Sequence, residues 1–253
     1  MNKTAVKTLE LLQLFTTHEQ LTLQEIVKLT KLPKTSVFRM VQSLVASGFL
    51  KKEGEVYELG LSLLQLGSLV AERLDVRKEA LPIMKQLKEE TNEAVNLVVK
   101  DGDEAIYVEK VETSEPVRVY TRVGRRAPLY AGACPRVLLT FMPSEEQKRY
   151  LDRVELIPIG SKTIVNREEL KTVINEAKKR GYTVSHSELT DYSSAVAVPI
   201  FNHEGKIAAG LSVVGPENRF QPAYIEQLVP KLKRAAEQIS KALGFVGGKY
   251  GEL

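Results

Sequence analysis

The sequence holds a single cysteine, Cys134, among its 253 residues. One thiol excludes an internal disulfide framework and suits a reducing cytosol. The chain also lacks any run of about 20 apolar residues, the length that a membrane-spanning helix needs. Its first residues are amphipathic and do not resemble an apolar signal segment. We therefore expect a cytoplasmic protein without a membrane partner.

Histidine is scarce as well, since the chain has only His18, His186 and His203. These three and Cys134 show no metal-ligand spacing. A glycine-rich phosphate loop is also missing, because the glycines of residues 244–248 follow the last predicted helix and lead into no new one. We expect neither a metal nor a cofactor.

The remaining composition is ordinary for a globular protein, with 43% hydrophobic and 27% charged residues. A length of 253 residues is comfortable for two domains and long for one core. The net charge of +4 neither requires nor excludes a nucleic-acid partner. The distribution of charge along the chain must decide that question.

Three helices are predicted within the first fifty residues. The first has apolar residues at helical spacing, namely Val6, Leu9, Leu12 and Phe15. The second begins at Thr22, which forms a capping box with Glu25. The third has Pro33 in its first turn and runs to about Ser47, with Gly48 as a natural C-terminal cap. The last two helices and the short turn between them form a helix-turn-helix unit.

The outward face of the third helix has the side chains that DNA recognition uses. Arginine and glutamine can donate paired hydrogen bonds to base edges, and lysine and serine can hold phosphates. Residues 26–52 contain six basic residues and no acidic one. The alternative is a solvated basic face of a helical domain. The predicted DNA-binding residues are Thr22, Lys34, Thr35, Ser36, Phe38, Arg39, Gln42, Ser43, Lys51 and Lys52.

A hairpin and a helix follow the helix-turn-helix unit. Residues 49–52 and 56–59 flank Gly54, which can take a positive φ, so a wing is predicted there. From Leu61 a helix carries an apolar stripe of Leu63, Leu66, Val70 and Leu74. The stripe either packs on its own domain or pairs two chains. Pairing would present two recognition helices about one DNA turn apart, to an operator expected to be an inverted repeat.

The rest of the chain has a mixed α/β pattern. Helices are predicted over residues 81–91, 134–141, 145–152, 167–180 and 223–243. Strands are predicted over residues 94–100, 104–111, 117–123, 194–201 and 207–214. The helix over 167–180 is well delimited, because Asn166 and Glu169 start it and Gly181 ends it.

Several short stretches, in this order and spacing, resemble the IclR-type family of transcriptional regulators. They are residues 32–39 (LPKTSVFR), 63–67 (LLQLG), 124–129 (GRRAPL), 180–182 (RGY), 197–200 (AVPI), 212–216 (SVVGP) and 235–240 (AAEQIS). The resemblance implies a GAF-like sensor domain, a dimer or dimer of dimers, and control by a small, often carboxylate, metabolite.

The expected fold class is therefore α+β. Its parts are a winged helix-turn-helix over residues 1–60, a linker helix over 61–75, a GAF-like α/β effector-binding domain over 76–246, and a tail over 247–253. The expected function is that of a transcriptional regulator, most simply a repressor, whose binding to double-stranded DNA changes with a small-molecule effector. We expect no enzymatic activity.

The resemblance also implies pocket residues. It places Ala133, Cys134, Ser185 or His186, Ala195, Ser212 and Val214 near the effector. From the residues themselves, the N–H groups of Ala133 and Cys134 would lie at a helix N-terminus, which attracts carboxylates. Ser185 and Ser212 could add hydroxyl donors, and Tyr130 could form a wall. The alternative is a tight turn packed in a core.

Three further hypotheses remain open at this stage. Four arginines, Arg118, Arg122, Arg125 and Arg126, suggest a clamp for phosphate or dicarboxylate. Cys134 with His186 as base is a candidate nucleophile, which would make the chain a catalyst with an appended DNA-binding-like domain. Thirdly, the winged helix could bind a protein instead of DNA.

Overall fold

The computed structural model describes residues 2–72 and 75–246. The chain divides into two compact units, Met1–Arg73 and Leu74–Leu253. The predicted tail, residues 247–253, lies outside the described residues, as do residues 73–74 of the predicted linker helix. None of the described helices has both the length and the apolar character that crossing a membrane requires.

The first unit is a helix-turn-helix with a small sheet. Its elements are α1 (Lys3–Gln13), a 3-10 turn η1 (Leu14–Thr16), β1 (Leu21–Thr22), α2 (Leu23–Thr30), α3 (Lys34–Ala46), β2 (Leu50–Glu53), β3 (Val56–Leu59) and α4 (Leu61–Glu72). The antiparallel sheet has the order β1-β3-β2, and β2 and β3 form the predicted wing. Leu11, Ile26, Val37 and Val41 are fully buried in its core. The predicted winged helix-turn-helix is confirmed.

The turn between α2 and α3 follows from local chemistry. The Thr22 hydroxyl accepts a hydrogen bond from the Glu25 N–H, and the Glu25 carboxylate accepts one from the Thr22 N–H at 2.8 Å, which completes the predicted capping box. Lys31 ends α2 in the left-handed region at φ 55°. Pro33 is the N-cap residue of α3, one position before the helix, whereas the sequence placed it in the first turn.

The second unit is built around one antiparallel sheet. Its elements are α5 (Asp75–Thr91), β4 (Ala94–Asp101), β5 (Glu104–Val111), β6 (Arg126–Pro128), α6 (Ala133–Phe141), α7 (Ser144–Arg153), α8 (Arg167–Arg180), β7 (Thr183–His186), β8 (Ser193–Phe201), β9 (Ile207–Pro216), a 3-10 turn η2 (Glu217–Arg219) and α9 (Pro222–Ala242). The strands are ordered β6-β5-β4-β9-β8-β7. The predicted α/β character of this part is confirmed.

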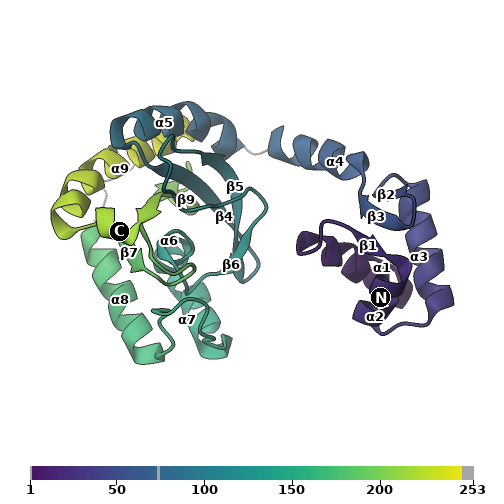
Figure 1. The fold of residues 1–253 in the computed structure, drawn as a ribbon. Coiled ribbons are helices and arrows are strands. Elements are labelled where there is room, and N and C mark those ends of the chain that lie inside the picture. The colour runs from purple at the N-terminus through teal and green to yellow at the C-terminus, as the bar shows by residue number, and fades with distance from the viewer. Residues whose placement is uncertain (1, 73–74, 247–253) are drawn as a thin grey trace. The chain divides into compact units, whose positions relative to one another are not determined.

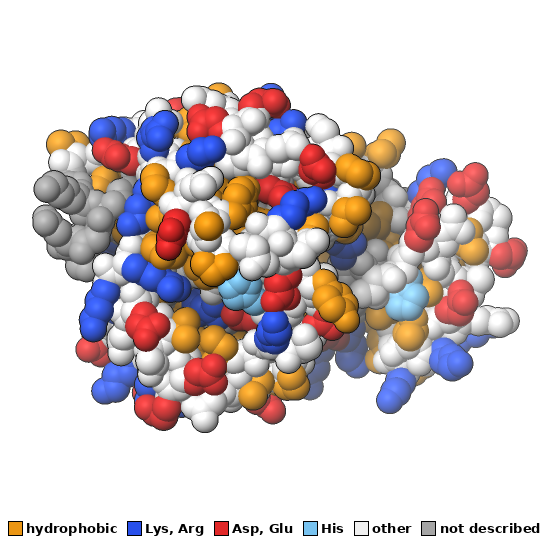
Figure 2. Space-filling model, turned by 60° about the vertical axis from the view of Figure 1, so that its left-hand side comes forward, with side chains coloured by type: hydrophobic (Ala, Val, Ile, Leu, Met, Phe, Trp, Pro, Cys, Tyr) orange, Lys and Arg blue, Asp and Glu red, His pale blue; other side chains and the backbone are white. Residues whose placement is uncertain are grey.

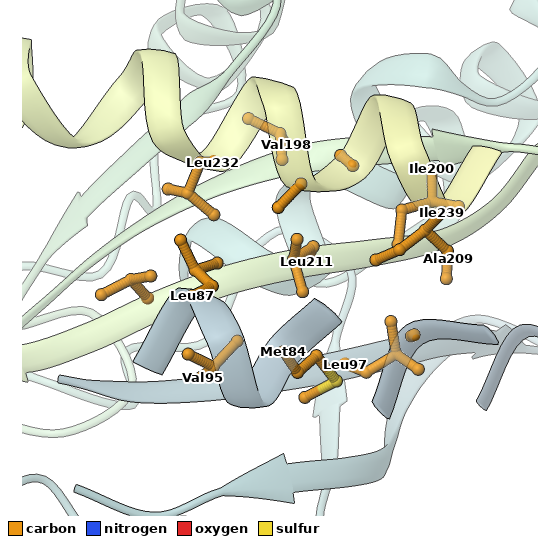
Figure 3. Packing of buried hydrophobic residues seen from close by; sticks show 14 of the residues in the cluster. Met84, Leu87, Val95, Leu97, Val198, Ile200, Ala209, Leu211, Leu232 and Ile239 are labelled. Atoms are coloured by element: carbon orange, nitrogen blue, oxygen red, sulfur yellow. The ribbon is translucent and has the colours of Figure 1, made fainter. Parts of the chain in front are cut away.

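The two faces of this sheet are covered by different helices (Figure 1). Side chains alternate between the faces of a strand. On one face, β4, β8 and β9 pack against α5 and α9, and Figure 3 shows Leu97, Leu211 and Ile239 in this layer. The opposite face packs against α6, which contacts α8 in turn. This second face, beside the start of α6, is where the cavity described below lies.

One predicted strand is absent. Residues 117–123 form no strand, although their alternating pattern indicated one. The place beside β5 is taken by β6, whose Ala127 pairs with Ala105. Residues 112–125 instead run irregularly and are held by side chains, as where Lys110 Nζ donates to the carbonyl of Thr121. The alternating pattern of residues 117–123 therefore belongs to a covering segment and not to a strand.

Candidate DNA interface and effector cavity

The face of α3 that points away from the core is polar and exposed. Thr35, Arg39 and Gln42 lie on one side of the helix, because successive residues are rotated by about 100°, and all three are exposed. Phe38 is 47% exposed beside them. An exposed aromatic ring next to arginine and glutamine suits contact with thymine methyl groups and base edges.

The basic residues around α3 keep their charges available. Among the described residues, Lys28, Lys31, Lys34 and Arg39 take part in no salt bridge, since none of the ion pairs includes them. Elsewhere the charges are mixed in sign, and Figure 2 shows blue and red side chains interspersed on the face that it presents. The helix-turn-helix is thus a local region of uncompensated positive charge.

The two wing lysines differ from each other. Lys51 Nζ lies 2.8 Å from Glu53 and 3.0 Å from Glu58, and these hydrogen bonds raise the pKa of Lys51. Lys52 has no carboxylate partner among the described residues and lies 6.0 Å from the centroid of the Tyr57 ring. The sequence predicted both lysines as phosphate contacts, but only Lys52 carries an uncompensated charge.

Thr22 has the predicted capping role, and its contact with DNA stays a prediction. Its hydroxyl donates to the Glu25 carboxylate at 2.7 Å and accepts from the Glu25 N–H. Both hydrogen-bonding functions are used to start α2. The remaining predicted contacts on α3, Lys34, Ser36 and Ser43, are at least partly accessible.

A small cavity lies in the second unit, at the N-terminal end of α6. Its volume is about 30 Å³. The lining residues come from the sheet, the start of α6, the segment 112–125 and the loop after β7, and they are Asn96, Tyr107, Val119, Thr121, Arg125, Gly132, Ala133, Cys134, Ser185, Leu189, Thr190, Ser193, Ala195, Ser212 and Val214. A water molecule needs roughly 10–15 Å³, so the cavity in this form admits water-sized groups only.

Six of the eight predicted pocket residues line this cavity: Ala133, Cys134, Ser185, Ala195, Ser212 and Val214. They converge because β4, β7, β8 and β9 are neighbours, with Asn96 opposite Ser212 and Ser185 opposite Ala195. Tyr130 and His186 do not line it. The Tyr130 hydroxyl instead donates to the carbonyl of Ile157 at 2.8 Å, and His186 Nδ1 lies 2.7 Å from the Ser194 hydroxyl.

Six lining residues with polar side chains were not among the predicted pocket residues: Asn96, Tyr107, Thr121, Arg125, Thr190 and Ser193. Asn96 is 1% exposed in β4, and its Oδ1 accepts a 2.7 Å hydrogen bond from Thr121 Oγ1. Tyr107 is buried, which raises the pKa of its hydroxyl. Arg125 lies 5.9 Å from the Tyr107 ring centroid. An asparagine within a buried strand was a detectable signal, because a buried amide needs a polar partner.

An ion pair is buried beside the start of α6. Arg136 Nη1 and Nη2 contact the two oxygens of Glu188 at 2.6 and 2.8 Å, and the two side chains are 1% and 6% exposed. Glu188 also accepts a 3.1 Å hydrogen bond from the N–H of Gly132. The helix N-terminus therefore already has a carboxylate close to its first N–H groups. The sequence analysis did not foresee this pair.

The four arginines do not form a clamp. Arg126 binds Asp101 and Glu104 at the hairpin of β4 and β5. Arg118 donates to the carbonyl of Glu115 at 3.3 Å. Arg125 lines the cavity and reaches the carbonyl of Leu189 at 3.4 Å. Residues 117–123, which hold Arg118 and Arg122, do not form the predicted strand.

Cys134 has the properties of a buried thiol and not of a nucleophile. It is 2% exposed, and burial raises its pKa to about 12 although a hydrogen bond with Ser212 acts in the opposite direction. A catalytic thiol needs a lowered pKa and a nearby base. The imidazole of His186 is engaged by Ser194 and does not line the cavity.

The geometry of these two units defines a class of protein. A winged helix-turn-helix with an exposed, uncompensated basic face precedes an α/β unit with a polar cavity between its sheet and a helix start. These two parts are those of a ligand-responsive DNA-binding regulator.

The chain belongs to the IclR family of bacterial transcriptional regulators. Residues 4–54 match the family profile described as the IclR helix-turn-helix domain, and residues 68–241 match the profile of the bacterial transcriptional regulator IclR C-terminal domain. The IclR-type resemblance inferred from the sequence is confirmed. The relatives found are named as transcriptional regulators, which agrees with the expectation that the chain is not an enzyme.

Relatives cover nearly the whole chain. The HTH-type transcriptional regulator KipR of Bacillus subtilis (strain 168) is 52% identical over 245 residues, which are 96% of this chain and 98% of KipR. The crystal structure of the Thermotoga maritima IclR has a TM-score of 0.79 at 32% identity and covers 97% of this chain and 100% of its own. An IclR homolog from Microbacterium hydrocarbonoxydans, complexed with 4-hydroxybenzoate, has a TM-score of 0.81 at 27% identity. It covers 95% of this chain and 99% of its own.

Proposed function

We propose that this chain is a cytoplasmic repressor that binds an inverted-repeat operator through α3 and loses affinity for it when a small carboxylate binds beside α6. The observation that carries the proposal is the face of α3, where Thr35, Arg39 and Gln42 are exposed next to lysines without acidic partners. In an apolar contact with another protein, the hydrogen-bonding groups of these side chains would have no partners. The base edges and phosphates of a major groove offer donors and acceptors that match them.

The chemistry of the cavity favours a carboxylate effector. The Arg125 guanidinium and the hydroxyl of Ser212 both line it. Such groups bind anions. The homolog from Microbacterium hydrocarbonoxydans, whose ligand is 4-hydroxybenzoate, supports the same class. The assignment of the second unit as a GAF-like domain is also part of this proposal.

The volume of about 30 Å³ implies that an effector must enlarge the cavity. Two of its walls, residues 112–125 and the loop after β7, contain no regular structure except short turns. The loop after β7 is held to α6 by the buried Arg136–Glu188 pair. We therefore assign the opening to residues 112–125, which have fewer backbone hydrogen bonds to lose than the sheet. Displacing the segment 112–125 breaks the hydrogen bond between Thr121 and Asn96. Effector binding is thereby coupled to a change in the covering segment.

Two chains are proposed to pair through α4. Four leucines of this helix, Leu61, Leu64, Leu66 and Leu69, are 40–82% exposed in the single chain. Leucines that are exposed on one helix form an apolar surface that a second copy can cover. Val70 and Leu74 of the predicted seam are outside the described side chains. We also propose that two such dimers can associate into a dimer of dimers.

The test is a fluorescence-anisotropy titration of the purified protein with labelled DNA from upstream of its own gene. A panel of small mono- and dicarboxylates, including 4-hydroxybenzoate, is then added to the complex. We expect nanomolar-range binding of one upstream fragment and release by at least one carboxylate. Binding that no member of the panel changes would contradict the effector proposal, and equal affinity for every fragment would contradict operator recognition.

A further inference from the structure

A second polar feature lies beside the face of α3 that the sequence assigns to DNA. A hollow of about 290 Å³ separates α1 from α3. Its lining residues are Thr4 and Thr8 from α1, and Ser36, Arg39, Met40 and Ser43 from α3. Met40, which is 8% exposed, forms the floor, and the other five side chains carry hydroxyl or guanidinium groups.

The hollow offers hydrogen-bond donors that are not used inside the protein. Among the described residues, the hydroxyls of Thr4 and Ser36 have no hydrogen-bond partner, and Arg39 has neither a hydrogen bond nor a salt bridge. The Thr8 hydroxyl donates to the carbonyl of Thr4 at 2.9 Å, and the Ser43 hydroxyl donates to that of Arg39 at 3.0 Å. A phosphate oxygen, which only accepts, matches the free donors.

Charge favours an anion at the same place. The first nine residues hold Lys3 and Lys7 and no acidic residue. With about 100° between successive residues, Lys7 lies about 60° around α1 from Thr4. Glu10, the one acidic residue of α1, is about 120° away from Thr4 on the same count. The rim of the hollow is therefore positive.

The position of the hollow relative to the face of α3 agrees with the path of a DNA strand. The exposed centre of α3 is formed by Thr35, Arg39 and Gln42, and Ser36 and Ser43 lie on the side toward α1. A helix in a major groove about 12 Å wide has one sugar-phosphate strand along each side. The strand on the α1 side must pass over the hollow.

We propose that the hollow receives a backbone phosphate of the bound duplex, which makes the first two turns of α1 part of the DNA interface. This inference rests on the proposed function, because it needs α3 to lie in a major groove. It assigns to Thr4, Lys7 and Thr8 a role in positioning the duplex and not in reading its sequence.

The experiment compares four forms of the full chain in anisotropy titrations with an upstream DNA fragment and with an unrelated fragment of equal length. The test variant is Thr4→Val/Thr8→Val, which removes both hydroxyls and keeps the branched side chains. Its control is Thr172→Val, since the Thr172 hydroxyl is also exposed on a helix and donates to the carbonyl four residues earlier at 3.0 Å. The fourth form is Lys7→Gln, measured at several salt concentrations.

The double variant is expected to bind both fragments about tenfold more weakly, the loss typical of one hydrogen bond to a charged group. Thr172→Val is expected to bind like the wild type, and Lys7→Gln to reduce the salt slope by about 0.9. Equal melting temperatures for all four forms exclude an unfolding effect.

Two results would overturn the inference. In one, the double variant binds like the wild type, which itself retains the upstream fragment, and the proposed function then stands without the contribution of α1. In the other, the double variant loses affinity for the upstream fragment only, which indicates base recognition. If the wild type itself retains no DNA, the proposed function fails first, and this outcome is distinguishable from both.

Discussion

The Arg136 guanidinium and the Glu188 carboxylate face each other through two hydrogen bonds of 2.6 and 2.8 Å. Both side chains are buried, and Arg136 also donates to the carbonyl of Val184 at 2.6 Å. The pair joins α6 to the loop after β7, whose residues Leu189 and Thr190 line the cavity. It therefore fixes one wall of the effector cavity relative to the start of α6.

Replacement of Arg136 alone is expected to be costly. Arg136→Met leaves the buried Glu188 charge without its partner and should lower the free energy of unfolding by about 3–5 kcal/mol. The double variant Arg136→Met/Glu188→Leu should recover part of that loss, because no buried charge is left. Urea titrations followed by circular dichroism measure both. Equal losses in the single and double variants would show that the pair's charges do not matter to the fold.

Arg39 is expected to determine sequence preference. Arg39→Ala should weaken binding to the upstream DNA by about 1–3 kcal/mol, the usual contribution of an arginine that contacts a base. It should also weaken binding to unrelated DNA, but by less, because Arg39 lines the hollow between α1 and α3 as well. Because Arg39 is exposed, the melting temperature should not change. Gel-shift titrations on both DNAs give the comparison, and an unchanged preference would remove Arg39 from base recognition.

The two wing lysines are expected to differ. Lys52→Ala should lower affinity for all DNA sequences and flatten the salt slope, as the loss of one phosphate contact does. Lys51→Ala should have the smaller effect, because Glu53 and Glu58 already neutralise that charge. Anisotropy titrations over a range of salt concentrations compare the slopes. A larger effect at Lys51 would mean that its ion pairs break on binding DNA.

Ser212 is expected to bind the effector. Ser212→Val removes a hydroxyl from the cavity and should abolish the thermal stabilisation that an effective carboxylate gives to the wild type. Ser194→Val is the matched control, since Ser194 is also a buried serine of the same sheet but binds His186 and does not line the cavity. A thermal-shift screen of carboxylates compares the forms. Equal shifts in the wild type and Ser212→Val would remove Ser212 from the site.

Cys134 is expected to resist alkylation. Its pKa of about 12 keeps the thiol protonated at pH 8, so iodoacetamide should react with it only after unfolding. The raised pKa also gives a stability contribution that is complete below about pH 8.5, the pKa of an unfolded cysteine, and is lost as the pH rises toward 12. Mass spectrometry of native and guanidinium-treated samples measures the reaction. Rapid labelling of the native protein would show a reactive thiol.

The sequence predicted the elements whose ends are set by local chemistry. Thr22 with Glu25 and Asn166 with Gly181 begin and end their helices as expected, because caps depend on residues within one turn. It also predicted six residues that now line the cavity, chiefly through the family resemblance. Their convergence could not be derived from local pattern, since it depends on the order of strands in the sheet.

The features that were missed or predicted wrongly depend on contacts between residues far apart in the sequence. Residues 117–123 alternate like a strand, but the six-stranded sheet does not include them. Arg136 follows Pro135 in a helix and gives no sign of burial until Glu188, 52 residues later, lies against it. Tyr130 was expected to form a wall of the cavity, whereas its hydroxyl binds the backbone of Ile157.

The most direct test of the account is the salt dependence of DNA binding by the purified wild-type chain. The account predicts retention of duplex DNA at about 50 mM salt and a loss of affinity of at least a hundredfold by about 200 mM, because the exposed cations of α3 and the wing displace counterions from phosphates. A chain that binds no duplex even in the dilute buffer, while remaining folded, would contradict it.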